Sequence, residues 1–306
     1  MHQLHTIHFN STKSCNLSCS FCYDNAIRGH SANLELDTIR QLAFDIAQCG
    51  GRRVILSGGE PLTRNDWQAI AMEFDQYDME VSLATNGTLI KDHTIDFLKT
   101  LKNPTLSISL DGGEKVHNQI RGSDTAYQRT IAGLEKLKNS AIPFHLNSVL
   151  FKDNISQIGI LTKIARDFDC SVRLTLLHNN GRADEMNTEA FDAEEILMIR
   201  EYCHVMRGQG VNIFLNLPPL LQYVDEIIPG RGAACGWAEN FCGVLANGDV
   251  TICGVASNEP QLVAGNILKE RFADIWQNAE LFSKTRTFDT CDLKGVCGKG
   301  SVNLTV

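Results

Sequence analysis

The sequence predicts an α/β protein in which a parallel (β/α)6 partial TIM barrel precedes a small C-terminal domain made of a β-hairpin and a helix. Short apolar runs alternate with segments of helical apolar spacing as far as about residue 180. Asn247-Gly248 then separates two further apolar runs, and the eleven cysteines gather mainly near the N-terminus and in the C-terminal region. Repeated β-then-α units form parallel sheets with right-handed crossovers, and Asn-Gly between apolar runs is a hairpin signal.

The barrel strands are predicted from six short apolar runs, at residues 6–9, 53–56, 80–84, 105–110, 144–149 and 171–176. Between the first two runs, Ile39, Leu42, Ala43 and Ile46 recur at helical spacing, and Gly50-Gly51 marks the end of that helix. Ligands of such sheets bind beyond the carboxyl ends of the strands. The residues directly after each strand are therefore the candidates for a site.

The loop after the first predicted strand carries Cys15, Cys19 and Cys22 at a C-x3-C-x2-C spacing. Iron–sulfur clusters are normally held by four Cys thiolates, so three thiols on one short loop predict a four-iron cluster with one open iron. A zinc site is the alternative, because zinc also binds thiolates. Zinc gives no reason for the polar turns that follow the next strands.

Polar turns follow the second, third and fourth predicted strands. Gly58 and Gly59 let a backbone turn approach a ligand closely, and the carboxylate of Glu60 beside them can accept hydrogen bonds from a protonated amine. Thr85-Asn86-Gly87 ends the third strand, and the segment 107–112 surrounds the end of the fourth. These groups should meet at one edge of the sheet.

These motifs, together with Asn147 in the fifth strand, resemble the radical S-adenosylmethionine superfamily over about 180 residues in the right order. The resemblance implies that Cys15, Cys19 and Cys22 bind a [4Fe–4S] cluster whose open iron is chelated by the amino and carboxylate groups of S-adenosylmethionine. It implies a set of contacts to that cofactor: Phe21 near the adenine, Gly58, Gly59 and Glu60 at the amino group, Ser109 and Asn147 at the methionine carboxylate and ribose, and in addition Thr85, Asp111 and Arg121. In this superfamily the electron of a reduced cluster cleaves S-adenosylmethionine to a 5′-deoxyadenosyl radical, which abstracts hydrogen from an unactivated C–H bond.

The second cysteine group lies after the predicted barrel, and the hairpin would place Cys242 near one of its ends and Cys253 near the other. The Gly248-x4-Cys253 spacing resembles the auxiliary-cluster extensions called twitch and SPASM domains. The resemblance implies one auxiliary [4Fe–4S] cluster, held by Cys235, Cys253, Cys291 and Cys297. This region has five cysteines, fewer than a full SPASM region, and the chain stops nine residues after Cys297, so we expect the shorter twitch type. The predicted domains are residues 1–215 and 216–306.

Cys242 is the fifth thiol of this group, and three interpretations remain open for it. It can replace one of the four cluster ligands, be a buried structural residue, or face the substrate and donate hydrogen to a radical. Cys49, Cys170 and Cys203 lie apart from both groups and are expected to be small buried hydrophobic residues.

Composition limits the partners. The net charge of -8 and the lack of a Lys/Arg cluster argue against nucleic acid. No apolar run is long enough to cross a membrane, and no secretion signal is recognisable, so we expect a cytoplasmic protein. A peptide or small molecule is the expected substrate, and a low-potential donor such as flavodoxin or ferredoxin is the expected reductant.

The leading hypothesis is modification of a ribosomally synthesised peptide by epimerisation, cross-linking or thioether formation, as related radical enzymes perform. The first predicted strand begins by about residue 6, so we expect no leader-binding domain before it, which weakens this hypothesis. The alternatives are epimerisation or dehydrogenation of an aminoglycoside-type sugar, oxidation of a tetrapyrrole side chain, and a non-enzymatic iron–sulfur electron-transfer protein.

Three further segments are interpreted without a role in chemistry. Residues 178–185 are expected to form a solvated turn, residues 217–220 a linker, and residues 193–206 an amphipathic helix packed on the sheet.

Overall fold

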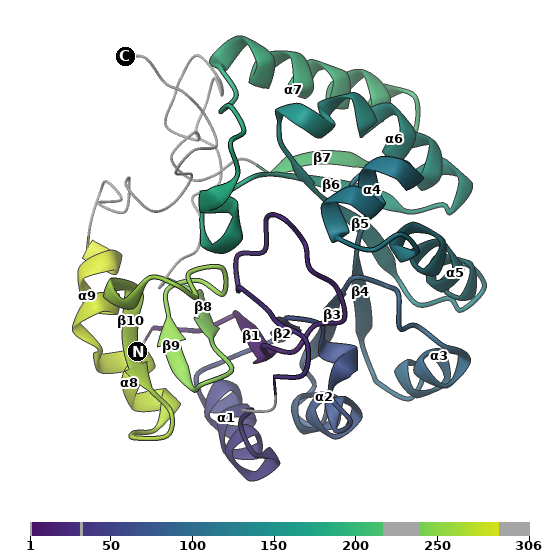
Figure 1. The fold of residues 1–306 in the computed structure, drawn as a ribbon. Coiled ribbons are helices and arrows are strands. Elements are labelled where there is room, and N and C mark those ends of the chain that lie inside the picture. The colour runs from purple at the N-terminus through teal and green to yellow at the C-terminus, as the bar shows by residue number, and fades with distance from the viewer. Residues whose placement is uncertain (1, 31–32, 217–238, 288–306) are drawn as a thin grey trace.

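The computed structural model describes residues 2–30, 33–216 and 239–287 of the 306-residue chain. Its strands form a single sheet of order β10-β9-β8-β1-β2-β3-β4-β5-β6-β7, which curls into an open barrel (Figure 1). The strands are β1 (Thr6–Thr12), β2 (Arg53–Gly58), β3 (Glu80–Thr85), β4 (Pro104–Ser109), β5 (Phe144–Leu150), β6 (Ser171–Leu176), β7 (Ile213–Asn216), β8 (Phe241–Val244), β9 (Asp249–Thr251) and β10 (Val263–Asn266). Strands β8 and β1 to β7 are parallel, and β9 and β10 extend the β8 edge in antiparallel pairing.

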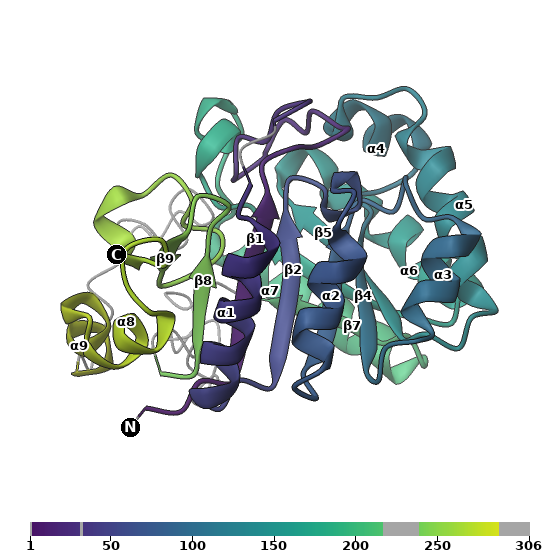
Figure 2. The same ribbon diagram turned by 90° about the horizontal axis from the view of Figure 1, so that it is seen from below.

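Helices cover the outer side of the barrel (Figure 2). The helices of the described residues are α1 (Leu36–Gln48), α2 (Trp67–Asp75), α3 (Asp92–Leu98), α4 (Glu114–Arg121), α5 (Ala126–Lys138), α6 (Ile158–Asp167), α7 (Ala193–Gly208), α8 (Phe272–Asn278) and α9 (Glu280–Thr287), with the short 3-10 turns η1 (Pro61–Thr63), η2 (Lys152–Gln157), η3 (Gly181–Glu185) and η5 (Pro260–Leu262). The predicted apolar stripe of α1 is buried, and Gly50 after it has a φ of 92°, which confirms the predicted stop.

The six predicted barrel strands are confirmed, with ends that differ by a few residues. Strands β7 and β10 were not predicted, because each has only four residues and a weak alternation of polarity. The predicted hairpin is also confirmed as β8 and β9, with Gly248 at a φ of 89° in its turn. It continues the barrel sheet, because β8 pairs in parallel with β1 from Thr6↔Phe241 to Phe9↔Val244.

The C-terminal elements are fixed to the start of the barrel by polar contacts. Arg271, at the start of α8, forms an ion pair with the buried Asp45 of α1. The indole of Trp276 in α8 donates to the carbonyl oxygen of His2 at 2.9 Å. The predicted domain boundary at residue 216 falls at the end of β7 and stays a prediction.

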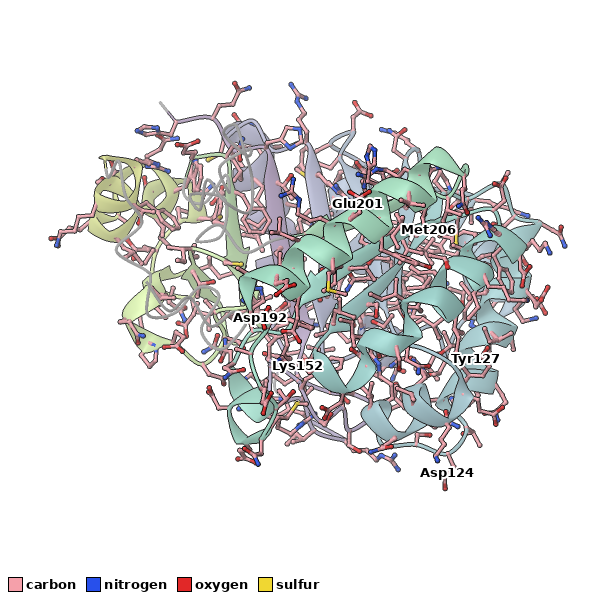
Figure 3. The ribbon with its side chains drawn as sticks, turned by 90° about the horizontal axis from the view of Figure 1, so that it is seen from above. Asp124, Tyr127, Lys152, Asp192, Glu201 and Met206 are labelled. Atoms are coloured by element: carbon pink, nitrogen blue, oxygen red, sulfur yellow. The ribbon has the colours of Figure 1, made fainter. Side chains whose placement is uncertain are left out.

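The expected helix at residues 193–206 is confirmed as α7, which begins after Asp192 and runs past Glu201 and Met206 (Figure 3). The Asp192 carboxylate accepts from the Glu195 backbone amide at 2.8 Å, and the Glu195 carboxylate accepts from the Asp192 amide at 2.9 Å. This capping box fixes the start of the helix.

The core lies between the sheet and the helices. Ile7 and Phe9 of β1 face outward and are fully buried there, whereas His8 and Asn10, in the opposite phase of the strand, face the inside of the barrel. Cys203 is buried in this core as expected, whereas Cys49 and Cys170 pack against the core and are only half-buried. None of the helices in the described part of the chain is long and apolar enough to span a bilayer.

Candidate active site

A cavity of about 340 Å³ lies inside the barrel, against the loop that follows β1. The structure brings most of the predicted site residues to its wall: Cys15, Cys19, Cys22, Phe21, Gly58, Gly59, Thr85, Ser109, Arg121 and Asn147. Glu60 and Asp111 are fully buried behind that wall. The prediction that residues after successive parallel strands meet at one edge is therefore confirmed in geometry.

Gly58 and Gly59 hold the cysteine loop in place by backbone contact. A Cβ added at Gly58 would lie 2.3 Å from the carbonyl oxygen of Thr12, and one added at Gly59 would lie 2.2 Å from that of Ser14. The Gly59 and Glu60 amides donate to these same oxygens, at 2.7 and 2.8 Å. The glycines were predicted to allow a close approach to a ligand; the structure shows that they also allow a close approach to the chain leading into Cys15.

Arg182 supports the same loop from the other side. Its Nε donates to the Cys19 carbonyl oxygen at 2.8 Å, and its Nη1 donates to that of Ala26 at 2.9 Å. Its backbone amide donates to the carbonyl oxygen of Cys22 at 3.0 Å. The prediction that residues 178–185 form only a solvated turn is wrong, because η3 in this segment anchors the cysteine loop.

An ion pair lies beneath the loop. Arg121 donates from Nε to the Asp111 carboxylate at 2.7 Å, and both side chains are buried. Burial alone would raise the pKa of Asp111, but the guanidinium of Arg121 and the ring of His117 together hold it below its ordinary value. The same guanidinium is 3.6 Å from the Cys19 sulfur and 5.1 Å from the centre of the Phe21 ring. Asp111 thus acts on the cavity through Arg121.

Glu60 joins the turn after β2 to the turn after β3. One carboxylate oxygen accepts from the Thr85 hydroxyl at 2.7 Å and from the Leu62 amide at 3.1 Å, and the other accepts from the Asn86 amide at 2.7 Å. Burial raises the pKa of Glu60, and these hydrogen bonds oppose the shift. Glu60 therefore fixes the arrangement of the two predicted turns.

Ser109 and Asn147 are direct neighbours across β4 and β5, and both line the cavity. The Asn147 side-chain oxygen lies 3.4 Å from the Thr175 hydroxyl of β6. The hydroxyl of Ser109 and the amide of Asn147 therefore offer adjacent hydrogen-bonding groups on the barrel wall.

The three loop thiols fit an iron–sulfur cluster by their chemistry. All three line one cavity, and Arg121 beside Cys19 favours its thiolate form. Burial raises the pKa of Cys15 to about 12 and also raises that of Cys19, so ligation must displace their protons. Among the residues that the structure describes, no three His, Cys, Asp or Glu side chains are grouped so as to hold a single metal ion.

Only part of the predicted auxiliary site lies within the described residues. Cys235, Cys291 and Cys297 lie outside the described residues, and Cys253 follows β9 in a partly buried position. Cys242 is fully buried and pairs in register with Ile7, whose side chain faces the outer core. Its thiol therefore lies on the side of β8 away from the cavity, among the groups of the core, which favours the structural interpretation of the three.

Known families and proteins resemble this chain along nearly its whole length. The model described as the radical SAM superfamily matches residues 9–163, and an iron–sulfur cluster-binding domain called SPASM matches residues 235–299. The AdoMet-dependent heme synthase of Methanosarcina barkeri is 32% identical over 94% of this chain and 85% of its own. Mycofactocin maturase MftC of Mycobacterium tuberculosis is 24% identical over 94% of this chain and 74% of its own.

A crystal structure of Streptococcus suis SuiB bound to its precursor peptide SuiA has the same fold. It superposes with a TM-score of 0.80 at 19% identity, over 97% of this chain and 70% of that one. The radical SAM model spans half of this chain, and the heme synthase is similar over almost all of it. Iron–sulfur clusters and S-adenosylmethionine are therefore the cofactors of this chain. The chain belongs to the radical S-adenosylmethionine superfamily and carries a SPASM iron–sulfur domain.

Proposed function

We propose that this enzyme reductively cleaves S-adenosylmethionine and abstracts a hydrogen atom from a C–H bond of a ribosomally synthesised peptide. The observation that carries the proposal is a single barrel cavity walled by three loop thiols on one side and by the polar ends of neighbouring strands on the other. When bound, the reduced cluster supplies the electron that breaks the bond from the sulfonium sulfur to the ribose carbon, which yields a radical able to attack an unactivated C–H bond.

The chain's own residues would bind and orient the reactants. Cys15, Cys19 and Cys22 would hold the loop cluster, with Arg121 balancing the charge of the thiolates. Phe21 would lie beside the adenine, and the turn of Gly58, Gly59 and Glu60, together with Thr85, would receive the methionine amino group. Ser109 and Asn147 would bind the carboxylate and ribose, a role that their adjacent positions on β4 and β5 support.

Positioning is the main contribution expected of such a site. Holding reactants in line can supply roughly 7–11 kcal/mol of the barrier, and a misplacement of only about 1 Å can cost about 100-fold in rate. The Asp111–Arg121 pair and the Arg182 contacts hold the cysteine loop, and the Glu60 hydrogen bonds hold the turns after β2 and β3. Cys253, with Cys235, Cys291 and Cys297, would hold the auxiliary cluster, and a flavodoxin or ferredoxin would supply the electron.

Peptide modification is supported by two relatives. One is named the mycofactocin maturase MftC, and the other is AlbA of Bacillus subtilis, named a biosynthesis protein of the bacteriocin subtilosin, which is 25% identical over 95% of this chain. Oxidation of a tetrapyrrole side chain is the second candidate. It is favoured by the heme synthase of Methanosarcina barkeri, which has higher identity to this chain than MftC or AlbA.

The test is anaerobic conversion of S-adenosylmethionine to 5′-deoxyadenosine by the reconstituted enzyme with dithionite. We expect Ser109→Ala and Asn147→Ala each to raise the Kd for S-adenosylmethionine about tenfold, equivalent to about 1.4 kcal/mol, because each removes one hydrogen-bonding partner. Ser156→Ala, at an exposed position, is the control and should leave the Kd unchanged. Absence of 5′-deoxyadenosine from wild-type enzyme with loaded clusters would contradict the proposal.

The product distinguishes the reaction types once a substrate turns over. Epimerisation returns one hydrogen to carbon, so a reaction in D2O would add one deuterium without another change of composition. Cross-linking, thioether formation or dehydrogenation removes two hydrogens and adds no deuterium. If Cys242 donated the hydrogen, Cys242→Ala would abolish deuterium incorporation; the placement of its thiol in the outer core predicts that incorporation persists in this variant, if its fold is retained.

A further inference from the structure

The ionisable side chains along the cavity wall, other than the thiols and Tyr23, are all arginines and histidines. Four arginines and three histidines line it, and within the described residues no Asp, Glu or Lys does. The chain as a whole has a net charge of -8, so this wall differs in sign from the rest of the molecule. A cavity with cationic walls favours an anionic ligand.

Three of the four arginines have protein partners, although the Nε of Arg53 makes no hydrogen bond to a described residue. Arg121 pairs with Asp111 at 2.7 Å, and Arg182 donates to two carbonyl oxygens of the cysteine loop. Arg53 lies 3.3 Å from the carboxylate of Glu80 and donates to the Ser82 hydroxyl. These three side chains therefore stabilise contacts within the protein.

Arg173 differs from them. It is partly buried, and no hydrogen bond or salt bridge reaches its guanidinium from residues 2–30, 33–216 or 239–287. Burial lowers the pKa of Arg173, and the nearby positive charge of Arg53 lowers it further, while the Glu80 carboxylate opposes part of this shift. A guanidinium that is partly removed from water and close to a like charge is costly unless an anion joins it.

The strand pattern places this charge inside the barrel. Val172, Leu174 and Leu176 of β6 are buried in the outer core, so Arg173 and Thr175, in the opposite phase, face inward and line the cavity. Arg53 faces the same cavity from β2 and His145 from β5.

Among residues 2–30, 33–216 and 239–287, the charged groups at this inner end of the cavity leave a surplus of positive charge. Burial and the two arginines lower the pKa of His145 to about 4, so it is neutral at pH 7. Two guanidinium charges against the single carboxylate of Glu80 leave one positive charge there. Arg53 and Glu80 begin β2 and β3, whereas the cysteine loop follows the end of β1, so this charge lies toward the opposite end of the barrel from the loop.

We propose that Arg173, assisted by Arg53, binds a carboxylate of the substrate at the inner end of the cavity and thereby orients the substrate toward the cysteine loop. This inference rests on the proposed function and names the substrate class as carboxylate-bearing. The carboxylate can belong to an acidic peptide or to a carboxylated macrocycle such as a tetrapyrrole. Arg173 has the planar, bidentate donor geometry that matches a carboxylate.

Binding measurements on the anaerobic holoenzyme with S-adenosylmethionine present test this proposal. One arm compares an acetylated, amidated Ala-Glu-Ala peptide with its Gln counterpart. The other compares a porphyrin bearing propionate groups with its methyl ester. We expect wild-type protein to bind the acidic member of at least one pair at least tenfold more tightly, and Arg173→Gln to lose that preference.

Two further variants serve as controls for this experiment. Arg173→Lys keeps the charge and should retain part of the preference, which separates loss of recognition from loss of folding. Arg166→Gln, on the exposed surface of α6, should behave as wild type. Preference for the acidic peptide supports a peptide source, and preference for the acidic porphyrin supports a macrocyclic one.

Three results would overturn the proposal: no preference in either arm, the same preference in Arg173→Gln as in wild type, or a tenfold loss of S-adenosylmethionine affinity in Arg173→Gln, which would assign the guanidinium to the cofactor's own carboxylate. Formation of 5′-deoxyadenosine is measured in the same preparations. If wild type forms none yet shows the carboxylate preference, the proposed function fails while the binding site stands.

Discussion

Gly59→Ala is expected to deprive the enzyme of its loop cluster and to lower S-adenosylmethionine cleavage by about two orders of magnitude or more. The added Cβ would lie 2.2 Å from the Ser14 carbonyl oxygen and 2.7 Å from its carbonyl carbon. These are backbone atoms, so the chain leading into Cys15 must shift as a unit. A displacement of about 1 Å at a reacting site can cost about 100-fold in rate, and a displaced thiol also weakens ligation.

The matched control is Gly208→Ala at the end of α7, where an added Cβ meets no atom within 4 Å and φ is not positive. Iron content, the charge-transfer absorbance of the cluster and the rate of 5′-deoxyadenosine formation are compared in the two variants. Equal iron and equal rates in both would show that Gly59 does not fix the loop. Auxiliary iron should remain in each, because the nearest atoms to the added Cβ at Gly59 belong to Lys13 and Ser14 of the loop and not to the second cysteine group.

Asp111→Asn is expected to destabilise the protein by about 3–5 kcal/mol, because it leaves the buried guanidinium of Arg121 without its counter-charge. The variant should also release Arg121 from its position beside the Cys19 sulfur, since the carboxylate orients it. We expect a lower denaturant midpoint together with a faster loss of the loop cluster to a chelator.

Asp92→Asn serves as the control, because Asp92 pairs with Lys136 at 2.6 Å but its side chain is 84% exposed. Exposed pairs of this kind contribute about 0–1 kcal/mol. Replacing both partners, in Asp111→Asn with Arg121→Gln, should restore part of the stability without restoring cluster retention. If Asp111→Asn unfolds at the same midpoint as the control, the buried pair does not stabilise the site as argued.

The general architecture was predictable because its signals are local. Each barrel strand is a short apolar run followed by a helix, and the site motifs come directly after the strands, where parallel topology brings them to one edge. Strands β7 and β10 escaped prediction because a four-residue strand depends on its neighbour in the sheet more than on its own sequence.

The contacts that hold the site together depend on partners far along the chain. In the sequence Arg182 belongs to a polar turn, yet the carbonyl oxygen that its side chain contacts in the cysteine loop is 163 residues away along the chain. The sequence indicates that Gly59 needs close approach but not that Ser14 is what approaches it. Likewise the direction of Cys242 follows from its register with Ile7, which no local pattern reveals. One local feature singles out Arg173: it is a charged residue between buried apolar neighbours in a strand.

The central claim is that the loop thiols hold the reactive cluster and that a second group of cysteines holds another. Iron and sulfide per chain, measured after anaerobic reconstitution of wild type and of a variant with Cys15, Cys19 and Cys22 all changed to Ala, test it most directly. The account predicts that the variant keeps about four irons, the content of one [4Fe–4S] cluster, and forms no 5′-deoxyadenosine. A variant that keeps no iron, or one that still cleaves S-adenosylmethionine, would contradict it.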